Sequence, residues 1–237
     1  MRLNCHAVIR TRLLAACIAA AGVAGWAVRA NAQGVRRVDL PDANGRYTLM
    51  IPPRVSDTGA PLVVYLHPTG GDRLTSFGED YWPMLRRLGC VVAVPHNDAN
   101  GVWPVGSDTF VRRVIGDAQK RADTDPNRTV LLGISGGGQL ALFLLDRWPE
   151  DYRAAVLVGT NPVVVRSGEA EWFYPSKKTR KKCPYFVFCH ITQGASLQYW
   201  RQVAARCAAD GASVSIVPVL GEVSHYQPPP ESLRDWL

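Results

Sequence analysis

The segment "TVLLGISGGGQLALFLLDRW", residues 129–148, joins two apolar runs through a turn made of small residues. The first run is short and continuous, as in a buried strand, and the second repeats its apolar residues at helical spacing. Between them Gly133, Ser135 and Gly137 form the G-x-S-x-G pattern of a sharp strand-to-helix turn, which lifts the serine hydroxyl clear of the sheet. Such a turn can also bind phosphate at the helix N-terminus. The strand–turn–helix context favours Ser135 as a nucleophile.

A serine hydroxyl is a poor nucleophile without a general base, so a histidine partner is expected. Three histidines stand at the ends of predicted central strands: His67, His96 and His190. His225 instead lies in "VLGEVSHYQPPP", after the last predicted strand and far down the chain from Ser135. We predict His225 as the base that takes the Ser135 proton.

Two backbone N–H groups must also point at the charge that develops on the carbonyl oxygen under attack. One is expected from Gly136, the residue after the nucleophile. The other is expected from the loop "HPTGG", residues 67–71, which follows an apolar strand. Pro68 has no N–H, so Thr69 is the predicted donor, with Gly70 as the alternative.

Strand-like and helix-like segments alternate along most of the chain. Strands are expected at residues 46–52, 61–67, 90–96, 128–134, 152–160, 184–191 and 213–219, and helices at 80–89, 107–122, 137–148 and 196–211. Short apolar strands separated by helices are typical of a mostly parallel sheet that is covered on both faces. The sequence therefore predicts a three-layer α/β domain, with its chemistry in loops at the carboxyl ends of the strands.

The N-terminal segment has the layout of a secretory signal peptide. Three arginines in residues 1–12 precede a small, apolar run, and "ANA" at residues 30–32 forms a cleavage site. We therefore expect residues 1–32 to be removed and residues 33–237 to form one domain, secreted or periplasmic; a retained N-terminal anchor is the alternative. The apolar run is shorter than the roughly 20 residues that span a bilayer, so no membrane partner is expected after cleavage.

The positive charge of the chain owes much to this leader. The leader holds four arginines and no acid, so 23 basic and 20 acidic residues remain after it. We infer no nucleic-acid partner, and the run "KKTRKK" (residues 177–182) is expected to be a solvated loop. An oxidising compartment permits disulfides among four cysteines, in any of three two-bridge pairings. These are Cys90, Cys183, Cys189 and Cys207.

Three stretches carry a family resemblance: "LHPTGG" (66–71), "DTDPNRTVLLGISGGGQLA" (123–141) and "GEVSH" (221–225). They resemble the secreted esterase/depolymerase group of α/β-hydrolases, which includes polyhydroxybutyrate depolymerases, feruloyl esterases and acetyl xylan esterases. The similarity runs from about residue 46 to residue 225. It implies the α/β-hydrolase fold, the nucleophile-before-histidine order seen here, and no metal or cofactor. Pro68 departs from the family's usual "HG".

A larger departure concerns the catalytic acid. The resemblance places it after the strand "YFVFCH" (185–190), where the matching position is Gly194, and no Asp or Glu lies between residues 183 and 209. The acid orients the histidine, and its replacement in a serine protease costs about 10⁴ in turnover. The carboxylates that we rank as substitutes are Glu171 and Glu169, in the long loop after residue 160, and then Glu222; Gln193 or Ser196 could orient His225 by a neutral hydrogen bond.

These residues predict an exported serine esterase that cleaves a small acyl ester, a polysaccharide-linked ester or a polyester. Trp103, after a central strand, is a candidate wall of the substrate pocket. The aromatic run Trp172–Tyr174 is a second candidate contact for a sugar, an aryl group or a polymer, or else packs its own loop. The alternative is a catalytically impaired hydrolase-fold protein that binds a carbohydrate or a protein partner at the same cleft. The loss of the acid at Gly194 favours that alternative.

Overall fold

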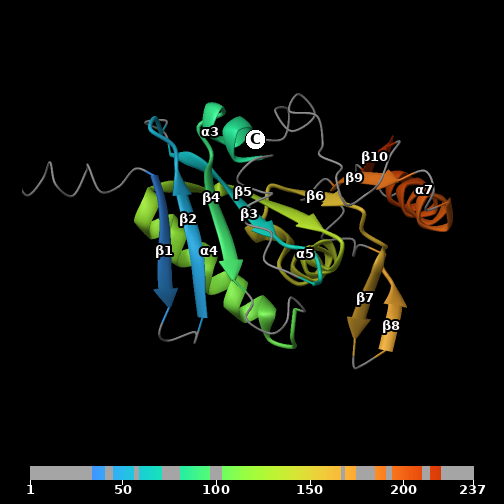
Figure 1. Cartoon of the computed structure of the whole chain (residues 1–237). Coiled ribbons are helices and arrows are strands. Elements are labelled where there is room, and N and C mark those ends of the chain that lie inside the picture. The colour runs from blue at the N-terminus through green and yellow to red at the C-terminus, as the bar shows by residue number, and fades with distance from the viewer. Residues whose placement is uncertain are drawn as a thin grey trace, which may run out of the picture. The chain divides into compact units, whose positions relative to one another are not determined.

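The computed structural model describes residues 34–40, 45–55, 59–70, 81–96, 103–166, 169–174, 185–190, 194–209 and 214–219. Apart from Gly34, all of these belong to a unit that begins at Val35. Its main sheet contains β1 (Gly34–Leu40), β2 (Gly45–Ile51), β3 (Ala60–Leu66), β4 (Val91–His96), β5 (Thr124–Ile134), β6 (Ala154–Val158), β9 (Tyr185–His190) and β10 (Val214–Val219). Figure 1 shows these strands side by side.

The strand order is β1-β2-β4-β3-β5-β6-β9-β10. β2 runs antiparallel to β4, and every pairing from β4 onward to β10 is parallel. β5 lies between β3 and β6, with Gly133 in register with Leu66 on one side and Leu157 on the other. Ser135 directly follows β5, so it lies at the carboxyl edge in the middle of the sheet.

The central strands are buried on both faces, which explains their continuous apolar sequences. All residues of β3 and β4 are buried. Along β3, Leu62, Val64 and Leu66 belong to one hydrophobic cluster, whereas Val63 and Tyr65 belong to a second. Because side chains alternate between the faces of a strand, the sheet separates two cores, as the sequence predicted.

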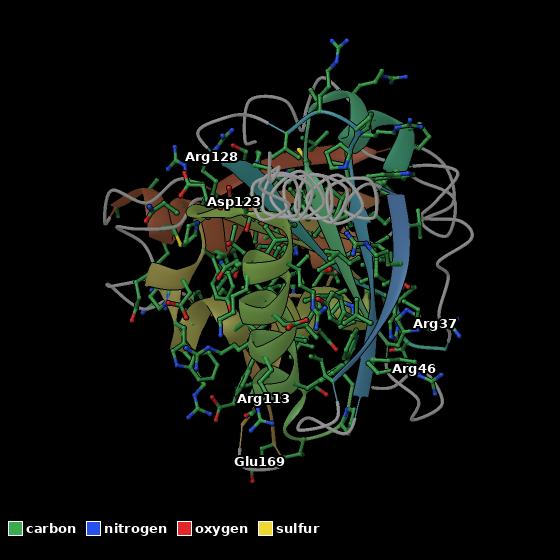
Figure 2. The ribbon with its side chains drawn as sticks, turned by 90° about the vertical axis from the view of Figure 1, so that its left-hand side faces the viewer. Arg37, Arg46, Arg113, Asp123, Arg128 and Glu169 are labelled. Atoms are coloured by element: carbon green, nitrogen blue, oxygen red, sulfur yellow. The ribbon has the colours of Figure 1, made fainter. Side chains whose placement is uncertain are left out.

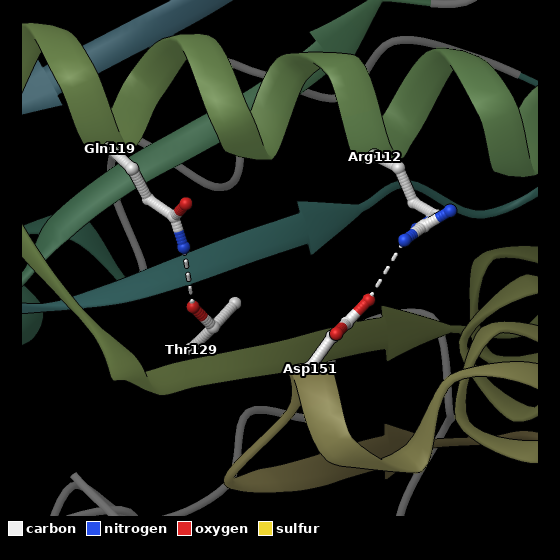
Figure 3. Close-up of polar contacts among 4 residues, drawn as sticks. All are labelled: Arg112, Gln119, Thr129 and Asp151. Atoms are coloured by element: carbon white, nitrogen blue, oxygen red, sulfur yellow. Dashed lines mark hydrogen bonds and ion pairs between the residues drawn. The ribbon is translucent and has the colours of Figure 1, made fainter.

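Helices cover both faces. One cluster includes buried residues of α4 (Ser107–Ala122), α5 (Gly136–Arg147) and α7 (Gly194–Ala209), and the other includes residues of α3 (Trp82–Arg87). Polar contacts also hold α4 in place (Figure 3): Gln119 donates to the Thr129 hydroxyl at 3.2 Å. Arg112 pairs at 3.1 Å with Asp151, in the 3₁₀ helix η2 (Pro149–Asp151). The three-layer α/β prediction is confirmed.

Three strands were not predicted. One is the edge strand β1. The others are β7 (Val163–Arg166) and β8 (Glu169–Trp172), which form an antiparallel pair where a long loop was expected. Figure 1 shows this pair beside α5 and α7, outside the main sheet.

The described cysteines do not support the disulfides that export would permit. Cys90 and Cys207 are buried, and neither is bridged. Burial raises the pKa of the Cys90 thiol to about 12, and the nearby charge of Arg128 only partly opposes this. Cys183 and the side chain of Cys189 lie outside what the structure describes. Within the described ranges, which exclude residues 1–33, no helix is long and apolar enough to cross a bilayer.

Candidate active site

Ser135 occupies a strained backbone conformation at the junction of β5 and α5. Its φ of 50° and ψ of −116° lie outside the regions that L-residues ordinarily adopt. Its N–H donates to the Val158 carbonyl at 2.9 Å, and its carbonyl accepts from the N–H of Gln139 at 3.1 Å. These bonds hold the backbone on both sides, and the residue is exposed. Strain that is held in this way is characteristic of functional sites.

The glycines around Ser135 are required by close packing. A Cβ at Gly133 would lie 2.6 Å from the Cα of Gly138. A Cβ at Gly137 would overlap the carbonyl oxygen of Leu66 and would lie 2.6 Å from that of His67. Strand, turn and helix therefore approach closely only because these positions lack side chains, which is the physical basis of the motif.

The two predicted oxyanion donors lie next to each other. A Cβ at Gly136 would overlap the hydroxyl oxygen of Thr69 and would lie 3.4 Å from the Thr69 backbone nitrogen. Thr69 is exposed, like Ser135. The loop after β3 and the first residue of α5 thus meet beside the serine, although they are far apart in the sequence.

Trp103 lies against His67, the first residue of that loop. The indole N–H donates to the His67 carbonyl at 3.0 Å, and the two rings stack with centroids 4.4 Å apart. Trp103 is half-buried. The indole therefore contacts the backbone two residues before Thr69; its predicted contact with substrate remains a prediction.

The two histidines whose side chains the structure describes are poor candidates for the base because both are buried. His67 is 0% exposed, and its Nδ1 donates to the Pro68 carbonyl at 2.9 Å. His96 shares a hydrogen bond of 2.8 Å with the Thr48 hydroxyl. Both rings are shielded from solvent, whereas Ser135 is exposed. His225 lies outside the described residues, so its assignment as the base stays a prediction.

The candidate acids fall on different parts of the fold. Glu169 and Glu171 are exposed on β8. In the strand register, Glu169 lies opposite Arg166 and Glu171 opposite Val164. Figure 2 shows Glu169 at the far end of this hairpin. Gly194, where the resemblance places the acid, begins α7. Glu222 and Gln193 lie outside the described residues.

Ser196, the neutral candidate on α7, has a distinctive environment. It is 9% exposed, and its hydroxyl has no hydrogen-bond partner within the part of the chain that the structure describes. Buried hydroxyls normally find a partner, so this hydroxyl is available for one.

The loop after β6 connects the turn at Ser135 to the hairpin. The hydroxyl of Thr160 occupies the space that a Cβ at Gly138 would need. Trp200, on α7, donates its indole N–H to the Thr160 carbonyl at 2.7 Å. Phe173, at the end of the hairpin, donates its backbone N–H to the Pro162 carbonyl at 2.8 Å. Thr160 was not predicted from the sequence, because only its packing on Gly138 reveals its place.

An aromatic group covers the junction of the hairpin and α7. Trp172, 55% exposed, stacks on Tyr199 with ring centroids 3.6 Å apart. Tyr199 donates to the Tyr174 hydroxyl at 3.2 Å, and the Arg206 guanidinium lies 4.4 Å from the centre of the Tyr174 ring. Partial burial and then the bond to Tyr174 raise the pKa of Tyr199 to about 12. Phe173 is buried, so this member of the aromatic run Trp172–Tyr174 packs in the core.

Among the described residues, we find no metal-binding cluster, that is, no group of three or more histidine, cysteine, aspartate or glutamate side chains that could hold a metal ion. The described site is therefore made of an exposed serine, two adjacent backbone donors and aromatic side chains. Such a set can carry out covalent catalysis at a carbonyl carbon if a base is supplied.

Comparison with known proteins gives a consistent fold assignment. No protein-family model and no curated protein sequence matches the chain. Among solved structures, a thermostable esterase is 19% identical with a TM-score of 0.59, over 79% of this chain and 54% of the esterase. This chain therefore spans about half of that enzyme's length.

Two further solved structures match this chain over a larger share of their own length. Acetyl xylan esterase from Aspergillus awamori is 14% identical with a TM-score of 0.54, over 66% of this chain and 72% of that one. The fluorophosphonate-binding serine hydrolase FphF from Staphylococcus aureus is 9% identical with a TM-score of 0.60, over 85% and 96%. Together with the strand order and the turn at Ser135, these similarities show that the chain has the α/β-hydrolase fold.

Proposed function

We propose that this protein is an exported serine esterase with Ser135 as its nucleophile. The observation that carries the proposal is the strained, exposed Ser135 at φ 50°, with Thr69 and Gly136 side by side next to it. A binding module has no need for such a turn, because the strain costs stability. The esterases among the structural neighbours support the same reaction class.

The proposed reaction has two halves. The Ser135 hydroxyl attacks the ester carbonyl while His225 takes its proton, and the Thr69 and Gly136 N–H groups bind the oxyanion. The C–O bond to the alcohol then breaks, and the alcohol leaves with the proton held by His225. Water, deprotonated by His225, attacks the acyl-enzyme and releases the carboxylic acid and free Ser135.

The substrate class is a carboxylic ester: a small acyl ester, a polysaccharide-linked ester or a polyester. Trp103 and the exposed Trp172 are the aromatic side chains proposed to contact its acyl, aryl or sugar part. Stacking on an exposed indole suits sugars and aromatic rings. The acetyl xylan esterase among the neighbours makes a polysaccharide-linked ester one of the first substrates to test.

Ser135→Ala tests the proposal directly. The full-length chain, with processing left to the host, is labelled with a fluorophosphonate probe and assayed with p-nitrophenyl acetate. Both signals should disappear in Ser135→Ala and persist in Ser215→Ala, a matched change on β10. Labelling that persists in Ser135→Ala would place the nucleophile elsewhere.

A second set of variants locates the residue that orients the histidine. Glu171→Gln, Glu169→Gln, Glu222→Gln and Ser196→Ala are compared by kcat. Loss of the orienting acid should lower kcat by about 10²–10⁴, and one variant should stand apart from the others. Equal, small effects in all four would leave Gln193 as the remaining candidate for orienting His225.

The second candidate function is a catalytically impaired protein that binds a carbohydrate or a protein at the same cleft. Gly194 at the family's acid position favours it, as does the exposure of both glutamates on β8. It predicts a folded parent chain that neither labels with the probe nor turns over the ester. That outcome would replace the esterase proposal.

A further inference from the structure

A cavity lies at the opposite edge of the sheet from Ser135. It has a volume of about 650 Å³ and is bounded by residues that follow β2, begin β3, end α3 and lie near the start of β5. Arg128, one of its lining residues, precedes Ser135 by seven positions on β5. At about 3.3 Å per residue this separates the two by roughly 20 Å. Figure 2 shows Arg128 in the upper part of the view and the hairpin residue Glu169 at the bottom.

Four arginines line this cavity: Arg54, Arg86, Arg87 and Arg128. No carboxylate is found among its described lining residues. Three prolines and Leu88 supply an apolar part of the wall. The volume lies within the range of roughly 300–1,000 Å³ that is usual for small-molecule sites. We call it the arginine pocket.

Among the residues that the structure describes, few groups compensate the charges of the arginine pocket. Arg54, Arg86 and Arg87 form no ion pair or hydrogen bond through their side chains with the residues that the structure describes. Arg128, unlike these three, does have an interaction partner in the chain. By contrast, Arg112 and Arg121 on α4 pair with Asp151 and Asp117. Like charges around one concavity repel each other, and an anion bound between them would relieve that repulsion.

We propose that the arginine pocket binds a phosphate-bearing ligand. Guanidinium groups present planar pairs of donors that match phosphate oxygens. A multivalent phosphate engages several of them at once, whereas a single carboxylate would leave most without a partner. The prolines and Leu88 then contact the carbon skeleton that carries the phosphate. A small organic phosphate and a phospholipid headgroup share this chemistry.

Calorimetric titration of the full-length chain with inorganic pyrophosphate at low ionic strength tests the proposal. The double variant Arg86→Gln/Arg87→Gln should bind pyrophosphate at least about tenfold more weakly. The control Arg37→Gln/Arg201→Gln removes the same charge from exposed positions on β1 and α7 and should change affinity less than about twofold. Thermal unfolding of each variant establishes that it is folded.

Vesicle flotation distinguishes the two sources of phosphate. Binding to phosphatidylcholine vesicles that contain phosphatidic acid, lost in the pocket double variant and kept in the control, indicates a lipid headgroup. Pyrophosphate binding without vesicle binding indicates a small soluble ligand. The proposal is overturned if neither probe binds, or if the pocket variant and the control lose binding equally.

Discussion

The Trp103 indole donates to the His67 carbonyl at 3.0 Å while its ring stacks on the His67 imidazole, with centroids 4.4 Å apart. This pair joins the segment before α4 to the loop after β3. His67 is two residues before Thr69, whose N–H is the proposed oxyanion donor. The His67 Nδ1 donates to the Pro68 carbonyl at 2.9 Å, and that carbonyl belongs to the same peptide unit as the Thr69 N–H. We therefore expect Trp103, by holding His67, to position the proposed oxyanion donor.

Trp103→Phe separates this positioning role from contact with substrate. Phenylalanine keeps an aromatic ring but loses the N–H, so the loop should hold its donor less well. We expect kcat on p-nitrophenyl acetate to fall about tenfold, with KM changed less than about twofold. A raised KM with unchanged kcat would instead identify Trp103 as a wall of the substrate pocket. The thermal unfolding midpoint of the variant serves as the control for global stability.

Thr69 offers a paired test of a backbone donor. Thr69→Ala removes the side chain but keeps the N–H, whereas Thr69→Pro removes the N–H itself. If that N–H binds the oxyanion, Thr69→Pro should lose about 10²–10³ in kcat, and Thr69→Ala should retain most of the activity. Single-turnover acylation kinetics measure the step concerned. Equal losses in the two variants would show that the threonine side chain matters instead.

The turn at Ser135 could be predicted because all of its signals are local. An apolar run, glycines at 133 and 137, and apolar residues at helical spacing lie within one segment of twenty residues. The same holds for α4, whose predicted range matches the observed Ser107–Ala122. The buried strands were also recognisable, because burial on both faces demands continuous apolar sequence.

β7, β8 and β1 were not predictable in the same way. β8 reads "EAEW", with two glutamates that disfavour a strand in isolation. It is extended because it pairs with β7, in the register Val163 with Trp172. β1, "GVRRVDL", lies at the edge of the sheet and is mostly exposed, so it lacks a continuous apolar run.

The parts of the site that depend on long-range contacts were the hardest to predict. The bond from Trp103 to His67 joins residues 36 positions apart. Thr160 is defined by its packing on Gly138 and by the bond from Trp200 to its carbonyl. Neither leaves a pattern in the neighbouring sequence. The same limit applies to the orienting acid, whose position depends on which loop approaches His225.

Gly137 and Gly116 should respond in opposite directions to alanine. At Gly137 a Cβ would overlap the Leu66 carbonyl, which is backbone and cannot move aside. We expect Gly137→Ala to lower the free energy of unfolding by about 3 kcal/mol. Gly116 lies in α4, and a Cβ added there would meet no atom within 4 Å, so Gly116→Ala should raise stability by about 0.5–1 kcal/mol. Urea unfolding of both variants tests this, and destabilisation by Gly116→Ala would contradict the packing described for α4.

Asp117 should make stability depend on pH. Burial raises the pKa of this carboxyl, but hydrogen bonds from Arg121 (2.6 Å) and Tyr47 (2.7 Å) and the charge of Arg121 outweigh it, so the pKa is lowered overall. Above the unfolded-state pKa, near 4, the carboxylate is ionised in both states and its folded contacts contribute fully. As the pH falls through the lower folded pKa, the carboxyl is protonated and that contribution is lost.

Asp117→Asn should therefore cost stability at neutral pH and little in acid. We expect the variant to lose about 1–2 kcal/mol of unfolding free energy at pH 7, and the difference from the parent chain to shrink as the pH falls below about 4. Tyr47→Phe should lose about 1 kcal/mol of unfolding free energy. It keeps the buried ring but removes the hydroxyl that donates to Asp117. Urea unfolding across this pH range measures both.

Asp39→Asn, which removes an exposed carboxylate on β1, is the control. If Asp117→Asn lost as much stability in acid as at pH 7, the contacts of Asp117 would not depend on its charge.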